Sequence, residues 1–167
     1  MIFRGWALAE EGQTQEGLAA VRAGLERIIA LGQRLAREFH LGLLADAHAC
    51  AGNVAEALAV LADAEGAVPG EEVWRADTLR RRAELLARAG ADTATVEAMF
   101  HEALTVARRQ GAKAYELRAG TRYALFLRAH GRIAEARELL APIYASFTEG
   151  FDTRDLIEAK ALLEELA

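Results

Sequence analysis

The chain has 167 residues, 53% hydrophobic and 27% charged, a balance that predicts one globular domain with a buried core and excludes a disordered chain. The net charge of −5 disfavours a nucleic-acid-binding surface, which needs clustered basic side chains. Only two prolines and one cysteine occur, and β-branched residues are sparse, so we expect helices and no internal disulfide.

A glycine recurs about every twenty residues and divides the chain into segments of helical length. These segments are rich in Ala, Leu, Glu and Arg, which favour helices. The glycines are Gly12, Gly32, Gly52, Gly70, Gly90, Gly111, Gly131 and Gly150. In chain order, the pattern predicts helices over residues 1–11, 14–31, 33–50, 53–66, 71–89, 93–110, 113–130, 133–147 and 152–166. Such a period is typical of a helical solenoid.

Individual residues refine the predicted helix ends. The first helix begins at Met1 without a capping residue, and the segment 67–70, which contains a proline, ends the fourth helix. Pro142 lies inside the eighth helix and is expected to kink or divide it. Asp152 is expected to cap the last helix, whose outer face is charged. We therefore interpret the chain as finished at its C-terminal end and cut at its N-terminal end, the C-terminal fragment of a longer protein.

Small residues recur at fixed distances from every second glycine of the series. Seven positions before these glycines lie Gly5, Ala45, Ala83 and Ala124, and five positions after three of them lie Gly17, Ala57 and Ala136. Four positions before them lie Leu8, His48, Leu86 and Leu127. Small residues at a helix crossing let two backbones approach closely. The fold class that this predicts is an all-α, right-handed superhelix of four helix pairs plus a C-terminal capping helix.

The small residue in the first helix, the glycine at the turn and the alanine five residues later resemble the tetratricopeptide repeat (TPR). The resemblance implies one TPR-like domain over residues 1–167, with repeats at about 1–31, 33–69, 71–110 and 113–149 and a capping helix at 152–166. Arg4, Arg82 and Gly120 stand where that family usually carries a large apolar side chain.

A second resemblance covers nearly the whole chain and is most specific at Phe147-Thr148-Glu149-Gly150-Phe151-Asp152-Thr153. This stretch, with residues 138–146, 155–163, 5–9 and 107–112, is similar to the C-terminal end of large bacterial signalling proteins. In those proteins a class III adenylate/guanylate cyclase domain or a transcriptional regulator precedes an AAA-type ATPase module and a tail of degenerate TPRs. The resemblance implies a parent protein and no activity for this segment.

The sequence contains no motif that carries a recognisable reaction. A phosphate-binding Gly-x-x-x-x-Gly-Lys-Ser/Thr loop and a Gly-x-Ser-x-Gly nucleophile elbow are both absent. His40 and His48 lie eight positions apart, which is not the spacing of a metal site on one helix. Cys50 is interpreted as a small core residue and the run Arg80–Arg82 as a solvated helix face. We therefore expect no enzyme activity, cofactor or metal in this chain.

In repeats of the resembled kind, the first helix of each pair lines a concave groove. Counting back from the turn glycines gives the candidate partner-binding residues Trp6, Phe39, Asp46, Asp77, Arg80, Glu84, Arg118 and Arg128. Arginine and aromatic side chains are typical anchors of protein interfaces. The alternative is that these polar residues pair with each other across neighbouring helices, Asp46 with Arg80 or Glu84 with Arg118.

Three hypotheses for function remain open. The first is a non-catalytic interaction or sensor module of a multidomain bacterial signalling protein, which binds a peptide or a partner domain in its groove. The second is a homodimerisation module, because a truncated first helix would expose Trp6 and Leu8. The third is a small-ligand pocket near Tyr144, Phe147 and Phe151, although these aromatics are more typical of a core. We expect a cytoplasmic protein with no membrane span and no nucleic-acid partner.

Overall fold

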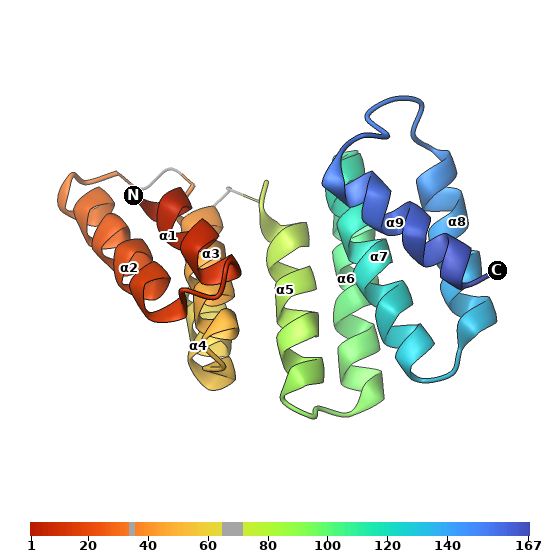
Figure 1. Cartoon of the computed structure of the whole chain (residues 1–167), viewed down its shortest axis with the longest axis horizontal. Helices are drawn as coiled ribbons and strands as arrows, with labels where there is room; N and C mark the ends of the chain where they lie inside the picture. The colour runs from red at the N-terminus through yellow and green to blue at the C-terminus, as the bar shows by residue number, and fades with distance from the viewer. Residues whose placement is uncertain (34–35, 65–71) are drawn as a thin grey trace.

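The computed structural model describes residues 1–33, 36–64 and 72–167, and these residues form α-helices and no strand. The helices are α1 (Ile2–Glu10), α2 (Thr14–Ala30), α3 (Arg37–Cys50), α4 (Val54–Ala64), α5 (Arg75–Arg88), α6 (Thr93–Gln110), α7 (Lys113–Ala129), α8 (Ile133–Ala145) and α9 (Arg154–Glu165). The predicted all-α fold class is confirmed (Figure 1).

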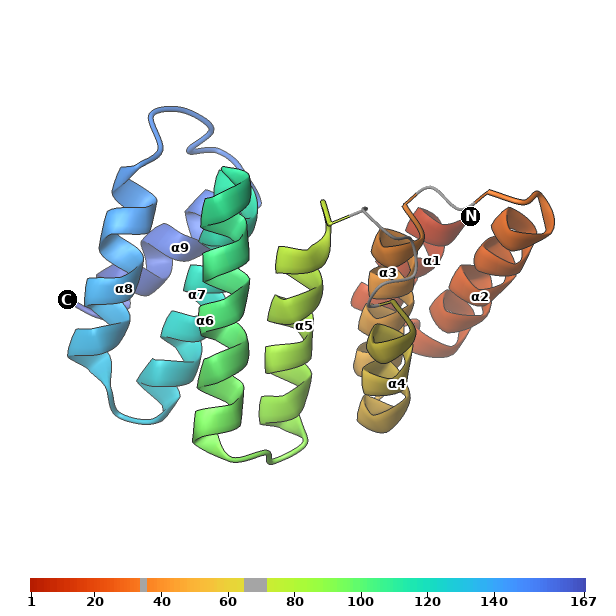
Figure 2. The ribbon, with the colours of Figure 1, turned by 180° about the vertical axis from the view of Figure 1, so that it is seen from behind.

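The helices form four antiparallel pairs, α1/α2, α3/α4, α5/α6 and α7/α8, which stack side by side along the molecule (Figure 1). The first helix of each pair packs against the first helix of the next pair, and α9 packs against both α7 and α8. Viewed from behind, the second helices form the opposite layer (Figure 2). We call the outer surface of α1, α3, α5 and α7, with α9 at its end, the first-helix face.

The turns within the pairs are built as the glycine pattern predicts. At Gly52 the backbone φ is +79°, and Gly52 N donates to Ala49 O while Asn53 N donates to His48 O. This pair of hydrogen bonds ends a helix at a left-handed residue, where glycine carries no steric penalty. The other three turn glycines of the pairs also have positive φ. The repeat therefore rests on one turn geometry used four times.

The small residues sit where two helices touch backbone to backbone. A Cβ atom added to Gly17 of α2 would lie 2.6 Å from both Ala9 N and Gly5 O of α1. Ala45, Ala83 and Ala124, which take the place of Gly5 in the later pairs, are fully buried. At Gly120 a Cβ would instead meet Ile143 Cδ1 at 2.6 Å, so a side-chain end fills this space.

Several predicted helix ends are wrong. The last helix begins at Arg154, and its N-cap residue is Thr153 in place of Asp152. Thr153 turns its hydroxyl back to Gly150 O at 2.7 Å and leaves the helix without a side-chain cap. Pro142 does not divide α8, which runs from Ile133 to Ala145 without interruption. The predicted stop at 67–70, with Gly70, lies outside the described residues.

The hydrophobic core is divided along the solenoid. A large cluster joins α5 to α9, and a smaller one joins α1, α2 and α3. Between them, the described residues form a small cluster of four buried side chains, Ala45, Ala57, Leu61 and Leu85. Among the described residues, the joint between α3/α4 and α5 thus has the smallest buried apolar cluster. Cys50, predicted to be a core residue, is exposed, and its Sγ lies 3.4 Å from Glu10 Oε1.

His48 replaces the leucine of the other pairs and is buried, with 3% of its surface exposed. Its Nε2 lies 3.2 Å from Arg22 Nη2, and its Nδ1 finds no hydrogen-bond partner in the described part of the chain. Burial lowers the pKa of His48, and the charge of Arg22 lowers it further. The folded protein therefore holds a neutral imidazole that the unfolded chain protonates below about pH 6.5.

Because the folded-state pKa of His48 is depressed, its contribution to stability is present above pH 6.5 and is lost as the pH falls below that value. We expect the His48→Leu variant to lack this loss, so that its Tm changes less than that of the wild type between pH 7 and 5. Thermal unfolding followed by circular dichroism at both pH values measures the difference. A pH dependence of Tm that is equal in the wild type and in His48→Leu would contradict the expectation.

Candidate functional site

The predicted groove residues all lie on the first helices, but they differ in how far their side chains are exposed. Asp77 is 3% exposed and Arg80 nearly buried, so neither presents its charge to a partner. Glu84 and Asp46 are partly exposed, whereas Arg118 and Arg128 are more than a third exposed. Trp6 and Phe39 are half-buried against the apolar cluster of α1–α3.

Asp77 is the centre of a charge network between α3 and α5. Arg80 Nε donates to Asp77 Oδ1 at 2.8 Å, and Arg81 Nη1 donates to Asp77 Oδ2. Burial opposes ionisation of this carboxyl, but the guanidinium groups of Arg80 and Arg81 outweigh it and hold the pKa of Asp77 at about 2. The charges inside the network therefore neutralise one another.

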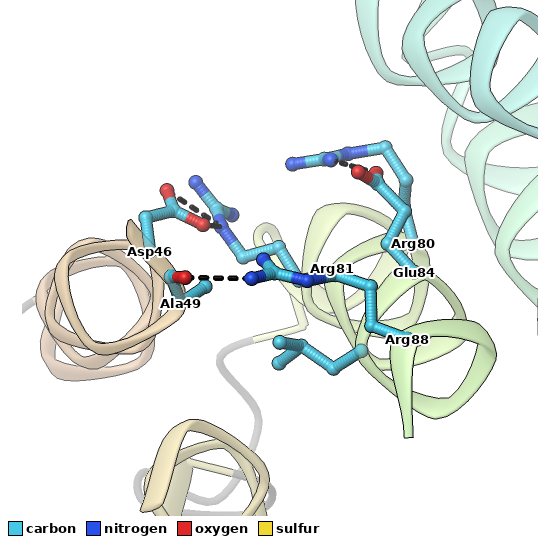
Figure 3. Close-up of a pocket in the computed structure, with 7 residues that line it drawn as sticks. Asp46, Ala49, Arg80, Arg81, Glu84 and Arg88 are labelled. Carbon is cyan, nitrogen blue, oxygen red and sulfur yellow. Dashed lines mark hydrogen bonds and ion pairs between the residues drawn. The ribbon is translucent and has the colours of Figure 1, made fainter. Parts of the chain in front are cut away.

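The network also joins the two helices. Arg81 Nε lies 2.9 Å from Asp46 Oδ1 on α3, and Arg88 Nη2 donates to Ala49 O at 2.7 Å, so two side chains of α5 reach across the joint (Figure 3). Arg80 turns instead toward Glu84 on its own helix (Figure 3). The cavity that they surround is about 60 Å³ and is lined by Asp46, Ala49, Arg80, Arg81, Glu84, Leu85 and Arg88. It has room for water rather than for a ligand.

The predicted pairing of polar residues across helices is confirmed in kind, but its partners are different. Asp46 binds Arg81 in place of Arg80, and Glu84 binds Arg80 and approaches Arg122 at 3.8 Å in place of Arg118. Arg81 is only 10% exposed, so the interpretation of Arg80–Arg82 as a solvated face is wrong for Arg80 and Arg81.

Basic residues of α7 pair with acidic residues of α9 along the end of the first-helix face. Arg118 Nε lies 2.6 Å from Asp155 Oδ2, Arg122 Nη2 lies 3.6 Å from Glu158 Oε2, and Arg128 pairs with Glu165. These pairs are partly exposed and contribute about 0–1 kcal/mol each. Their arginines remain available to exchange an internal carboxylate for one from a partner.

A row of aromatic rings runs across the first turns of the first helices. Its members are Phe3 on α1, Phe39 on α3, Trp74 at the N-cap of α5 and Tyr115 on α7. Successive ring centroids are 6.0, 4.7 and 6.4 Å apart. Arg118 Cζ lies 5.9 Å from the centre of the Tyr115 ring and closes the row. We call these four residues the aromatic row.

Of the aromatic row, only Phe39 was among the groove residues predicted from the sequence. Phe39 lies thirteen positions before Gly52, the largest distance from a turn glycine among the predicted groove residues. Trp74 and Tyr115 both lie sixteen positions before their glycines, Gly90 and Gly131, one helical turn further back. Continuing the same count would therefore have found them.

A second hollow lies on the other layer, between α6, α7 and α8. It measures about 350 Å³ and is lined by Glu97, His101, Tyr123, Leu127, Arg132, Glu135, Glu138 and Leu139. Tyr123 Oη lies 3.2 Å from Glu97 Oε2 and 3.1 Å from His101 Nε2. Burial, with the charge of Glu97, raises the pKa of Tyr123 to about 12. The hydroxyl is therefore a neutral donor within an internal network.

The aromatics near the last helices contribute mainly to packing. Tyr144 and Phe147 pack against the large core cluster, while Phe151 is 47% exposed, with its ring 5.9 Å from that of Tyr144. In residues 1–33, 36–64 and 72–167, no group of three or more His, Cys, Asp or Glu side chains is placed to bind a metal. None of the described helices is both long and apolar enough to cross a membrane.

Comparison with known proteins supports the fold. Two crystal structures of TPR-like repeats of a putative kinesin light chain of Podosopora anserina superpose with TM-scores of 0.70 and 0.69 at 16% and 18% identity. Each match covers 99% of this chain and 82% of the other. The chain thus has a TPR-like helical-repeat fold.

The chain is similar in sequence to part of a much longer protein. No protein-family model matches the chain. An uncharacterized protein of Rhizobium meliloti (strain 1021) is 33% identical over 121 residues, which are 71% of this chain. The match spans only 12% of that protein's length.

Proposed function

We propose that this chain is a non-catalytic interaction module that binds a peptide or a partner domain on its first-helix face. The observation that carries the proposal is the arrangement of accessible aromatic and arginine side chains on that one face, the aromatic row together with Arg118 and Arg128. Such side chains are enriched at the centres of protein interfaces. The TPR-like fold supports the proposal, since stacked repeats offer an extended binding surface.

The proposal extends to the protein that contains this domain. The module stands as one domain of four repeats and a final helix in a multidomain bacterial signalling protein of the cytoplasm, of the cyclase or ATPase-regulator type, without a cofactor of its own. The short share of the Rhizobium meliloti protein that the match spans supports a large multidomain setting. Binding of the partner to the first-helix face then changes the orientation of the module relative to the other domains of that protein.

Site-specific photo-cross-linking in the full-length parent tests the proposed face. The photoreactive amino acid p-benzoylphenylalanine replaces Arg118 on α7 or, as a matched control, Arg137 on the exposed side of α8. We expect position 118 to join one defined polypeptide segment, in another protein or in the parent itself, and position 137 to join none. Equal labelling from both positions, or none from 118, overturns the assignment of the face.

The first pair exposes four large apolar side chains, Met1, Phe3, Ile29 and Leu31, whereas Trp6 and Leu8, which were predicted to be exposed, are half-buried. This patch favours homodimerisation as the second candidate function. Sedimentation of the chain at high concentration tests it: a dimer supports this function, and a strict monomer rules it out.

A further inference from the structure

We infer that the aromatic row is a docking edge for an extended, proline-rich segment that carries acidic residues. The inference rests on the proposed function and names the class of partner that the first-helix face accepts. It follows from three properties of the row, which are its exposure, its ring spacing and the charge beside it.

The row offers ring surface that the core does not use. Phe3 is 60% exposed, and Phe39, Trp74 and Tyr115 are each only partly buried. Next to Trp74, Val73 is 59% exposed and extends the apolar surface. The first helices begin along one edge of the molecule (Figure 1). The ring contacts join one aromatic side chain from each of the four pairs into one line.

The spacing of the rings fits an extended chain laid across them. A polyproline II helix rises about 3.1 Å per residue, so each step of 4.7–6.4 Å between rings corresponds to about two residues. Aromatic-lined surfaces bind such helices because the bound conformation is already populated in the free peptide, which lowers the entropy lost on binding. The rings are already in contact with each other and leave no slot into which a nucleic-acid base could insert.

The accessible charge beside the row is basic. Each ring has a basic residue within two positions in the sequence, Arg4, Arg37, Arg75 and Lys113. Arg4, Arg37 and Lys113 are exposed, and Arg118 at the end of the row is 44% exposed. Of the acidic residues on the same side, Asp77 is buried between Arg80 and Arg81, whereas Glu72 is 64% exposed and lies 3.1 Å from Arg109. Arg4 and Arg75 also have carboxylates nearby, Glu16 at 3.8 Å and Glu102 at 2.9 Å. The exposed side chains beside the row are still basic in excess, so charge complementarity favours carboxylates in the partner.

A fluorescence-anisotropy titration of the whole chain tests this inference. The probe is a fluorescein-labelled peptide of repeated Pro-Pro-Glu triplets. Peptides of equal length made of Gly-Gly-Glu or Pro-Pro-Lys triplets and a labelled oligothymidylate are the comparisons. We expect the Pro-Pro-Glu peptide to bind at least about tenfold more tightly than each of the others, with an affinity that falls as salt rises. Equal binding of the Gly-Gly-Glu peptide, or tighter binding of oligothymidylate, overturns the inference.

Variants of the row locate the binding. We expect Trp74→Ala to weaken binding of the Pro-Pro-Glu peptide by about thirtyfold and Phe3→Ser by about fivefold. Ile157→Ser removes a similarly exposed apolar side chain, 53% exposed, from α9 outside the row and should leave the affinity unchanged. Circular dichroism checks that each variant is folded. If Trp74→Ala is not, Phe3→Ser decides alone, because most of its surface is exposed. Equal effects of Phe3→Ser and Ile157→Ser overturn the inference.

The two experiments distinguish failure of the proposed interaction function from failure of the ligand class assigned to the aromatic row. If cross-links from position 118 find a partner but the Pro-Pro-Glu peptide does not bind, the chemistry assigned to the aromatic row is wrong and the interaction function stands. If neither experiment detects binding on this face, both are wrong.

Discussion

Replacing Asp77 by alanine is expected to lower the free energy of unfolding by about 3 kcal/mol and the Tm by about 10 °C. The carboxylate lies between the guanidinium groups of Arg80 and Arg81, and all three side chains are at most 13% exposed. Without it, Arg80 and Arg81 each lose the more buried of their two carboxylate partners and keep only Glu84 and Asp46, respectively. Urea unfolding followed by circular dichroism measures the loss.

Asp155→Ala is the matched control for this prediction. Asp155 also binds an arginine, Arg118 at 2.6 Å, but both side chains are about a third or more exposed. Its removal should cost at most about 1 kcal/mol. Similar losses for the two variants would mean that the buried network is no more important for stability than a surface ion pair.

The lowered pKa of Asp77 also predicts how the free energy of unfolding changes at acidic pH. Because its folded-state pKa of about 2 lies below the ordinary value of 3.8, its stabilisation is present above about pH 4 and is lost as the pH falls toward 2. The Asp77→Ala variant lacks this component, so its unfolding free energy should fall less than that of the wild type over the same range.

The second large effect is expected at the crossing of α1 and α2. Gly17→Ala should destabilise the protein by about 2–3 kcal/mol, because the new Cβ would lie 2.6 Å from Ala9 N and Gly5 O. Both atoms belong to the backbone, so one helix has to move. The loss should exceed the gain of about 1 kcal/mol that alanine normally brings to a helix interior.

Gly120→Ala tests whether backbone contact is the cause. There the new Cβ would meet Ile143 Cδ1, the end of a side chain that can rotate away. We expect a change within about 1 kcal/mol, since helix propensity offsets the small rearrangement. The comparison uses the same substitution in helices of the same length, 17 residues each. If Gly120→Ala cost as much as Gly17→Ala, the backbone contact would not explain the result.

The helices and their pairing were predictable from the sequence because they depend on local properties. Turn glycines, small residues at fixed spacing and strong helix formers all repeat with one period, so each pair supports the assignment of the others. The predicted starts of α3 and α5 were too early by four residues each, 33 against Arg37 and 71 against Arg75. Helix ends depend on individual caps and turns, which the period does not determine.

The partners in the charge network could not be predicted in the same way. A repeat pattern places Asp46, Arg80 and Arg81 on neighbouring helices, but the rotation of one helix by about 100° decides which arginine reaches α3. At the joint, α5 contributes Leu85 to a buried cluster with Ala45, Ala57 and Leu61. The groove prediction failed at Asp77 for the same reason, since the side chain faces the joint rather than the open surface.

The glycines of this chain resist substitution for two different reasons. One is a left-handed backbone torsion, and the other is a lack of space for a side chain. At Gly52 a Cβ has open space around it, but the backbone φ of +79° is unfavourable for an L-amino acid. At Gly17 the backbone is helical, but there is no room. A D-alanine would therefore relieve the torsional penalty at Gly52, because its preferred torsions are the mirror image, whereas the torsions at Gly17 already suit an L-residue and only space is lacking. The one recurring residue thus encodes a torsional requirement at the turns and a steric one at the helix crossings.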